Sequence, residues 1–219
     1  MVRIVKEHQV RKTQIWDVSE KLFFSKGYEN TSVRDIIDQI EIAKGTFYHY
    51  FKSKEDLLDD IIKRRTEEDV NTLKEVVGRN DLDVSKKFNA FFQIFNRKNN
   101  KEWVRAMMNS SENVLVKDKL KHSLTEALSE LLTKILDQGI REGTFKIGLP
   151  KQTSELILTL NFHVSESLGA LMSESTDLMS GQDEIDKKIQ AYEYSVSKIL
   201  GLFADEVQLI DKEFINMFS

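Results

Sequence analysis

Residues 31–54 read TSVRDIIDQIEIAKGTFYHYFKSK, and this stretch predicts two short helices joined by a tight turn. Ser32 precedes an apolar run and Asp35 follows three residues later, a spacing that resembles the capping box at the start of many helices. The first helix then has one apolar face, because hydrophobic residues recur at helical spacing, at Val33, Ile36, Ile37 and Ile40.

The second helix of this stretch carries an unusual set of side chains. Phe47 and Phe51 lie four residues apart, so they share one face and can pack inward. The rest of the circumference presents hydroxyls, a cation and a glycine, at Lys44, Gly45, Thr46, Tyr48, His49 and Tyr50. A short helix of this kind is typical of a helix-turn-helix whose second helix enters a major groove of DNA. The spacing alone also fits an ordinary helical hairpin in a protein core.

The flanking residues extend this pair of helices into a larger unit. Upstream, residues 10–26 predict a helix with one apolar stripe, closed by Gly27. Residues 1–7 fit a short arm that contacts phosphate, and they fit a solvated tail equally well. Downstream, a long connecting helix is expected to run from Ser53, which can cap it, to Gly78.

The rest of the chain predicts further helices, since one proline and nine glycines leave few helix breakers. Apolar spacing places helices at residues 83–98, 114–142, 152–173, 184–204 and 207–218, with a short segment at 102–110 and a loop around Ser180 and Gly181. Residues 152–173 are apolar on nearly every side, which indicates burial on both flanks. The fold class expected is all-α, with an N-terminal three-helix helix-turn-helix unit at 1–52 and a larger helical domain at 53–219.

The composition and the absence of known motifs exclude several classes of function. The chain has 219 residues and no cysteine, which excludes disulfides and thiolate metal sites. Its four histidines do not fall at metal-ligand spacing, and no catalytic triad, carboxylate pair or glycine-rich phosphate loop stands out. We therefore expect no enzyme activity, no metal and no cofactor. Without a secretion signal or a long apolar run, the expected location is the cytoplasm, with no membrane association.

Charge is distributed unevenly along the chain. The net charge is −4, which by itself argues against a nucleic-acid partner. Residues 1–54, however, hold ten lysines and arginines against seven acidic residues, so this segment carries +3 and the remainder −7. A basic end on an acidic body is the asymmetry expected when one end meets phosphate.

Residues 43–57, AKGTFYHYFKSKEDL, closely resemble the signature of the TetR family of bacterial transcriptional regulators. The match continues upstream through the family's first two helices, at Ile15, Phe23, Gly27, Tyr28, Thr31 and Arg34. Beyond residue 57 the resemblance rests on length, helicity and the phrase GIREGTF at 139–145.

The resemblance implies a double-stranded DNA operator as partner and assigns roles to residues. The DNA-binding set is Ser32, Arg34, Lys44, Gly45, Thr46, Tyr48, His49, Tyr50 and Lys54. In this pattern Lys44, Gly45 and Thr46 meet base edges or nearby backbone. Tyr48, His49, Tyr50 and Lys54 hold phosphates, and Arg34 reaches into the groove from the preceding helix.

Two positions depart from the family pattern. Glu41 stands where the family usually has glycine, at the left-handed position of the turn, and Ala43 stands at the N-cap of the reading helix, where serine is common. Each departure costs on the order of 1 kcal/mol. Glu41 also places an anion near DNA.

An aromatic and methionine set in the later helices has two interpretations. Its members are Phe88, Phe91, Phe92, Phe95, Trp103, Met107, Met108 and Phe162. Core packing explains each residue singly, but Phe91 and Phe92 are adjacent and cannot share one narrow face. Since the family's middle helices enclose a ligand cavity, we interpret the set as the wall of a site for a small hydrophobic effector. His163, Asn161 and Glu166 are candidate polar anchors.

The resemblance implies a ligand-responsive repressor that binds a palindrome-like operator as a homodimer. The two long helices expected at 152–173 and 184–204 would form a four-helix bundle with their mates. The alternative is a DNA-bound structural or protein-responsive factor without a small-molecule switch. An enclosed apolar cavity would favour the first, and a filled core the second.

Overall fold

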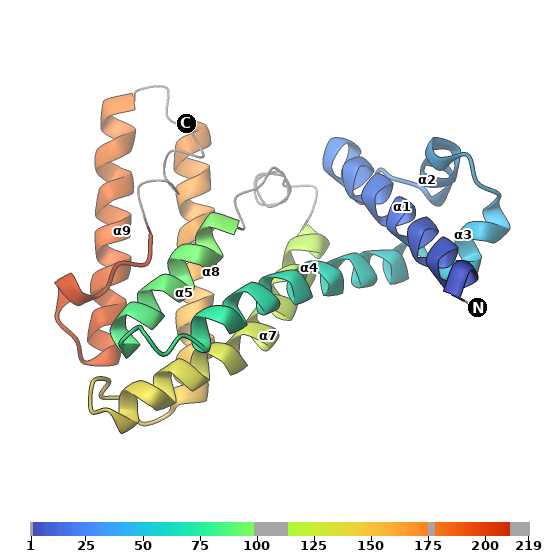
Figure 1. The fold of residues 1–219 in the computed structure, drawn as a ribbon. Helices are drawn as coiled ribbons and strands as arrows, with labels where there is room; N and C mark the ends of the chain where they lie inside the picture. Colours follow the sequence, from blue (N-terminus) through green and yellow to red (C-terminus); the bar gives the residue numbers. More distant parts are fainter. Residues whose placement is uncertain (1, 99–113, 175–177, 211–219) are drawn as a thin grey trace.

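The computed structural model describes residues 2–98, 114–174 and 178–210, and Figure 1 draws the chain as two connected groups of helices. Throughout these ranges the regular elements are helices and no strand is present, which confirms the all-α fold class. In chain order they are α1 (Val2–Lys26), α2 (Val33–Ile40), α3 (Lys44–Tyr50), α4 (Lys54–Val77), α5 (Val84–Lys98), α7 (Val114–Arg141), α8 (Pro150–Glu174), α9 (Leu178–Leu200) and a 3-10 turn (Ala204–Glu206).

Helix α4 joins the two groups. Helices α1, α2 and α3 form a small unit at one end, which we call the head, and α4 runs from it into the remaining helices, which we call the body (Figure 1). Within the body, α7 packs along both α4 and α8, while α9 packs on α8. The body core is apolar and includes Leu128, Leu132, Leu136 and Ile157, all without exposed surface.

Side chains fix where α2 and α4 begin, as the sequence predicts. The Asp35 amide donates to Ser32 Oγ over 3.1 Å and the Ser32 amide donates to Asp35 Oδ2 over 2.8 Å, so the capping box is present. At α4 the Asp56 amide donates to Ser53 Oγ over 3.0 Å. The C-cap of α4 is Gly78. The boundaries of the connecting helix are therefore confirmed.

Three expected boundaries are wrong. Helix α1 begins at Val2 in place of an arm, because no glycine or proline interrupts residues 2–26. Helix α9 begins at Leu178 and contains Ser180 and Gly181, where a loop was expected; a single glycine inside a helix costs only about 1 kcal/mol relative to alanine. Residues 207–210 are not helical. The expected segment at 102–110 and the rest of the last expected helix lie outside the described residues.

Helix α8 is buried on one flank only within a single chain. Ile157, Leu158 and Leu168 have no exposed surface, as expected of an apolar helix in a core. Leu156 is 62% exposed and Leu160 is 36% exposed. Burial on both flanks was expected and is wrong for a single chain. An apolar strip of α8, at Leu156 and Leu160, remains uncovered. In the described ranges none of the helices is long and apolar enough to cross a membrane.

Candidate DNA-binding surface

The short helix α3 is anchored from its inner face. Phe47 is fully buried and Phe51 is 2% exposed, and their rings lie 5.9 Å apart. The turn before α3 is closed by the Ile42 amide, which donates to the Ile37 carbonyl over 3.1 Å. These contacts confirm the two inward anchors and hold the outer face of α3 in a fixed orientation.

The turn carries both departures from the family pattern. Glu41 is left-handed, with φ 57° and ψ 47°, and it is the one non-glycine residue with positive φ in the part of the chain that the structure describes. Ala43 is the N-cap of α3 and provides no side-chain hydrogen bond. Both expectations are confirmed. The first turn of α3 therefore leaves amide groups without a capping side chain.

Four residues present an outer surface on α3. Lys44, Gly45 and His49 are exposed, and Tyr48 is 46% exposed. A Cβ atom added at Gly45 would meet no atom within 4 Å, so the backbone there faces open space. Thr46 is half-buried beside them. The structure thus gathers the expected base-reading residues and Tyr48 on one helix.

Other members of the predicted set are engaged within the protein. Tyr50 is half-buried, with its ring 4.5 Å from that of His8 on α1. Lys54 Nζ donates to the Tyr28 carbonyl over 2.7 Å and lies 4.1 Å from the centre of the Tyr28 ring. Lys54 therefore ties α4 to the turn after α1. Its expected contact with phosphate stays a prediction.

Helix α2 contributes two members of the set at its start. Arg34 has an 87% exposed side chain and lies 3.5 Å from Asp38, one turn further along α2. Ser32 holds the capping box, where Lys26 also donates to Asp35 over 2.8 Å. The hydrogen bonds from Lys26 and Ser32 hold the pKa of Asp35 well below its usual range. Since that pKa is depressed, this support for α2 is present above the ordinary carboxyl pKa and is lost in strong acid.

Replacing Glu41 with glycine is expected to stabilise the fold by up to about 1 kcal/mol, because glycine adopts positive φ without a Cβ clash. It should also tighten DNA binding by removing an anion beside α3. Glu41→Gln is the matched control, since it removes the charge and keeps the strained backbone. Urea unfolding should show a higher midpoint for Glu41→Gly than for Glu41→Gln. DNA titration should show tighter binding for both variants than for the unmodified chain. Equal unfolding midpoints for the two would contradict the strain argument.

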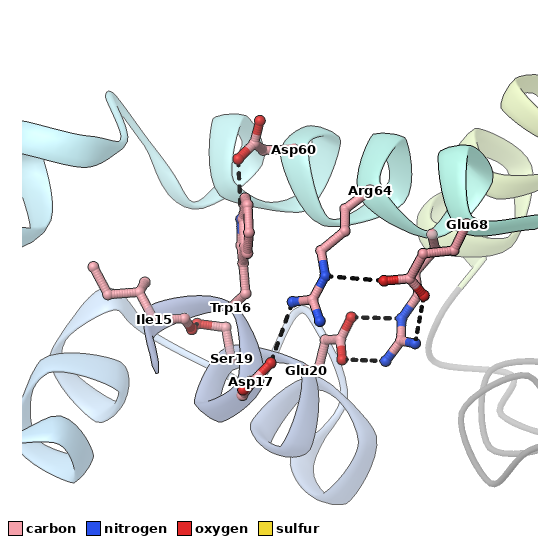
Figure 2. Close-up of polar contacts among 9 residues, drawn as sticks. Ile15, Trp16, Asp17, Ser19, Glu20, Asp60, Arg64 and Glu68 are labelled. Carbon is pink, nitrogen blue, oxygen red and sulfur yellow. Dashed lines mark hydrogen bonds and ion pairs between the residues drawn. The ribbon is translucent and has the colours of Figure 1, made fainter. Parts of the chain in front are cut away.

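The head contacts α4 through a cluster of charged and aromatic side chains, which we call the junction (Figure 2). Arg65 on α4 forms two bonds to Glu20 on α1, with Nε 2.9 Å from Oε1 and Nη2 2.6 Å from Oε2. Glu20 is only 6% exposed. Arg64 donates to Asp17 over 3.2 Å, and Glu68 accepts from both arginines over 3.3 Å.

Trp16 lies at the centre of the junction. Its indole Nε1 donates to Asp60 Oδ2 over 3.0 Å (Figure 2). Two cations flank its ring, Lys12 at 4.7 Å and Arg64 at 5.0 Å from the centre. Trp16 is buried between α1 and α4. Its polar partners on α4 were missed, because a helical pattern does not show which charges face each other across two helices.

The phenylalanines of α5 form a tight cluster in the body. Phe88, Phe91, Phe92 and Phe95 are each at most 2% exposed. The centres of the Phe91 and Phe92 rings lie 5.3 Å apart, and the Phe95 ring lies 5.8 Å from that of Phe162 on α8. The structure therefore brings five members of the expected ligand set together. Trp103, Met107 and Met108 lie outside the described residues.

Only one of the three candidate anchors reaches this cluster. His163 is exposed on α8, and Glu166 pairs with Lys121 over 2.6 Å. Asn161 is buried, and Tyr192 on α9 donates to its Oδ1 over 3.1 Å. Asn96, next to Phe95 on α5, donates to the same oxygen over 3.3 Å. Sequence reasoning missed Asn96 and Tyr192, although a buried asparagine beside four phenylalanines is a signal of a polar partner nearby.

Comparisons with known proteins agree with this architecture. The family model of bacterial regulatory proteins of the tetR family matches residues 15–61, and the model of a tetracyclin repressor-like C-terminal domain matches residues 93–182. The HTH-type transcriptional repressor KstR2 of Rhodococcus jostii is 29% identical over 147 residues, covering 62% of this chain and 68% of that protein. The fatty acid metabolism regulator protein of Bacillus subtilis is 29% identical over 152 residues, covering 66% and 76%.

A solved structure shows the same fold. The crystal structure of the regulator FadR from Bacillus subtilis in complex with stearoyl-CoA superposes with a TM-score of 0.61 at 22% sequence identity, covering 84% of this chain and 97% of that one. The family models match both the head and the body, and the two relatives are named as a transcriptional repressor and a metabolism regulator. The chain is a DNA-binding transcriptional regulator of the TetR family.

Proposed function

We propose that the chain is a ligand-responsive repressor that binds a palindrome-like operator as a homodimer and is released by a small hydrophobic ligand. The observation that carries the proposal is the outer surface of α3, where Lys44, Gly45 and Tyr48 are exposed on a helix anchored by Phe47 and Phe51. A cytoplasmic location follows from action on the bacterial chromosome.

In this proposal residues 1–52 bind DNA and residues 53–219 bind ligand and dimerise. Lys44, Gly45 and Thr46 read base edges, because only a few side chains at the start of a helix reach into the groove. Tyr48 and His49 contact phosphates beside them, and Arg34 reaches in from α2. Tyr50 and Lys54 contact phosphate while they also hold the head together.

The uncovered strip of α8 supports the homodimer. A single helix-turn-helix makes few contacts, so specific binding calls for two heads on successive grooves. Leu156 and Leu160 lie one turn apart on α8, and Tyr194 on the adjacent helix α9 is 53% exposed. Pairing α8 and α9 with the same helices of a second copy would bury these side chains in a four-helix bundle.

The phenylalanine cluster supports an apolar effector. Five aromatic side chains and the buried amide of Asn161 match the composition of sites that bind long apolar molecules with few polar contacts. The FadR structure holds stearoyl-CoA, so a long-chain acyl-CoA is the first effector to test on this chain. One observation favours the alternative of a regulator without a small-molecule switch: Phe88, Phe91 and Phe92 are each at most 1% exposed and pack on one another.

Reciprocal titration tests the proposal. An operator selected from random duplexes should lose roughly 10-fold to 100-fold in affinity when stearoyl-CoA saturates the protein, a range typical of coupled sites. Stearoyl-CoA should then bind the operator complex more weakly by the same factor, because coupling is reciprocal. Fluorescence anisotropy of labelled operator and calorimetry of stearoyl-CoA measure the two factors. Ligand binding with no change in DNA affinity would leave the alternative as the function.

A further inference from the structure

After α9 the chain turns back along the body. Gly201 has a positive φ of 73°, which favours glycine, and the residues that follow run across α9 and α5 (Figure 1, red). We call residues 203–210 the strap. Its first half contains the 3-10 turn Ala204–Glu206, and its second half is extended or irregular.

Three amide side chains of α5 hold the strap by its backbone. Asn89 donates to the Glu206 carbonyl over 2.9 Å and accepts from the Gln208 amide over 3.1 Å. Gln93 donates to the Gln208 carbonyl over 2.8 Å, and Asn96 donates to the Leu209 carbonyl over 3.0 Å. Asn89, Gln93 and Asn96 are spaced four and three residues apart, so they form one polar face on the helix whose other faces carry phenylalanines.

Helix α9 holds the strap from its other side. Glu193 Oε1 accepts from the amides of Leu209 and Ile210, over 2.7 Å and 3.2 Å. Burial raises the pKa of the Glu193 carboxyl, and the two amides lower it in part. Beside these contacts an open hollow of about 470 Å³ separates the start of the strap from α9, lined by Gln190, Tyr194 and Asp205 among others. The strap is therefore held tightly along residues 206–210 and loosely before them.

The strap is linked to one end of the phenylalanine cluster through a pair of asparagines. Leu209 is fully buried and Val207 is 1% exposed. Asn96, which binds the Leu209 carbonyl, also bonds to Asn161, and the neighbour of Asn161 is Phe162, whose ring packs on Phe95. The contacts therefore lead from the strap to the asparagine pair and on to the Phe95 and Phe162 rings.

Among the elements within residues 2–98, 114–174 and 178–210, the strap is best suited to move when a ligand enters. The rings of Phe88, Phe91 and Phe92 are covered, so a bulky ligand needs a covering element to leave. The surrounding helices pack on one another, α7 on both α4 and α8, and α5 on both α4 and α7. The strap, in contrast, is held by hydrogen bonds from side chains to its backbone, which water can replace once it lifts off.

We propose that the strap is a displaceable cover of the phenylalanine cluster, so that strap docking and the uptake of a bulky apolar ligand oppose each other. The proposal rests on the proposed function only in taking this cluster as the ligand site. It predicts that loosening the strap raises access to the cluster without changing the head.

The test uses a double variant of the full chain, Asn89→Ala with Gln93→Ala, and the dye 1-anilinonaphthalene-8-sulfonate as an apolar probe. The double variant should bind the dye at least fivefold more tightly than the unmodified chain. Gln190→Ala is the matched control, because Gln190 lines the hollow on α9 and is not one of the side chains that hold the strap described above. This variant should bind the dye like the unmodified chain. Near-ultraviolet circular dichroism verifies that the variants keep a packed core. Equal dye affinity in all three proteins would overturn the proposal.

A second experiment removes the strap and adds it back as a peptide. A chain ending at Leu202 should bind the dye more tightly, and excess synthetic FADEVQLI, the sequence of residues 203–210, should reverse this. If that chain does not fold, hydrogen exchange of the full chain decides instead: dye binding should speed exchange at the Leu209 and Ile210 amides at least tenfold, and unchanged exchange would refute the proposal. These readouts need neither operator nor acyl-CoA, so a failure of stearoyl-CoA to release DNA would count against the proposed function and leave the strap proposal standing.

Discussion

Gly45→Glu is expected to abolish operator binding, with a loss of about 100-fold or more, while leaving the fold intact. A Cβ atom at Gly45 meets nothing within 4 Å, and the residue lies in the first turn of α3 on its exposed side. The new side chain therefore fits the free protein. In the proposed complex it would hold the backbone away from the groove and place an anion among phosphates, where repulsion directly weakens binding.

Gly45→Ala separates the two effects of this substitution. Alanine should raise the free energy of unfolding by up to about 1 kcal/mol, because it favours a helix more than glycine does. It should still weaken operator binding, by roughly tenfold, through loss of close backbone approach. Thermal unfolding and anisotropy titration on the same samples measure both quantities.

Gly148→Glu is the matched control for the charge. Gly148 lies in the turn between α7 and α8, and a Cβ there also meets open space. The substitution adds the same charge far from α3, so operator affinity should stay within about twofold. Equal losses for Gly45→Glu and Gly148→Glu would show that net charge, and not the surface of α3, governs binding.

Arg65→Met is expected to lower the free energy of unfolding by roughly 2–4 kcal/mol, because it leaves the carboxylate of Glu20 buried without its cation. Both oxygens of Glu20 accept from Arg65, and Glu20 is only 6% exposed. Methionine keeps most of the length and volume of the side chain. The loss would therefore come from the unpaired charge and not from a cavity.

The neighbouring residue provides the control. Arg64→Met makes the same chemical change one position earlier, but its partner Asp17 has a 49% exposed side chain. Water can solvate that carboxylate, so the expected loss is about 1 kcal/mol or less. Adding Glu20→Gln to Arg65→Met should restore part of the stability. Urea unfolding of the four proteins checks this, and similar losses for the two arginine variants would show that Glu20 is not effectively buried.

The local chemistry of the head could be predicted from the sequence. The Ser32–Asp35 capping box, the left-handed Glu41 and the cap at Ser53 each depend on residues within a few positions of one another. The inward faces of Phe47 and Phe51 follow from helical spacing in the same way. The family signature then added the roles of the exposed residues on α3, and those roles remain predictions.

The junction and the strap could not be predicted, because both depend on residues far apart in the chain. Arg65 and Glu20 are 45 positions apart, and Asn89 and Gln208 are 119 positions apart. Residues 207–210 have an apolar pattern that suits a helix. In the structure their backbone groups bond to side chains of α5 and α9 instead, and this tertiary context overrides the local preference.

The polar character of the junction affects how the salt dependence of DNA binding should be interpreted. The slope of log affinity against log salt is normally taken as a count of phosphates that the protein neutralises. Here the head is held on α4 partly by half-buried ion pairs such as Arg64–Asp17 and Lys12–Asp60, which the same salt ions screen in part. Salt would then change how firmly the heads are held as well as how strongly they are attracted. Both effects lower the affinity as salt rises, so both steepen the slope. For this protein the slope therefore gives an upper bound on the number of phosphates that the protein neutralises.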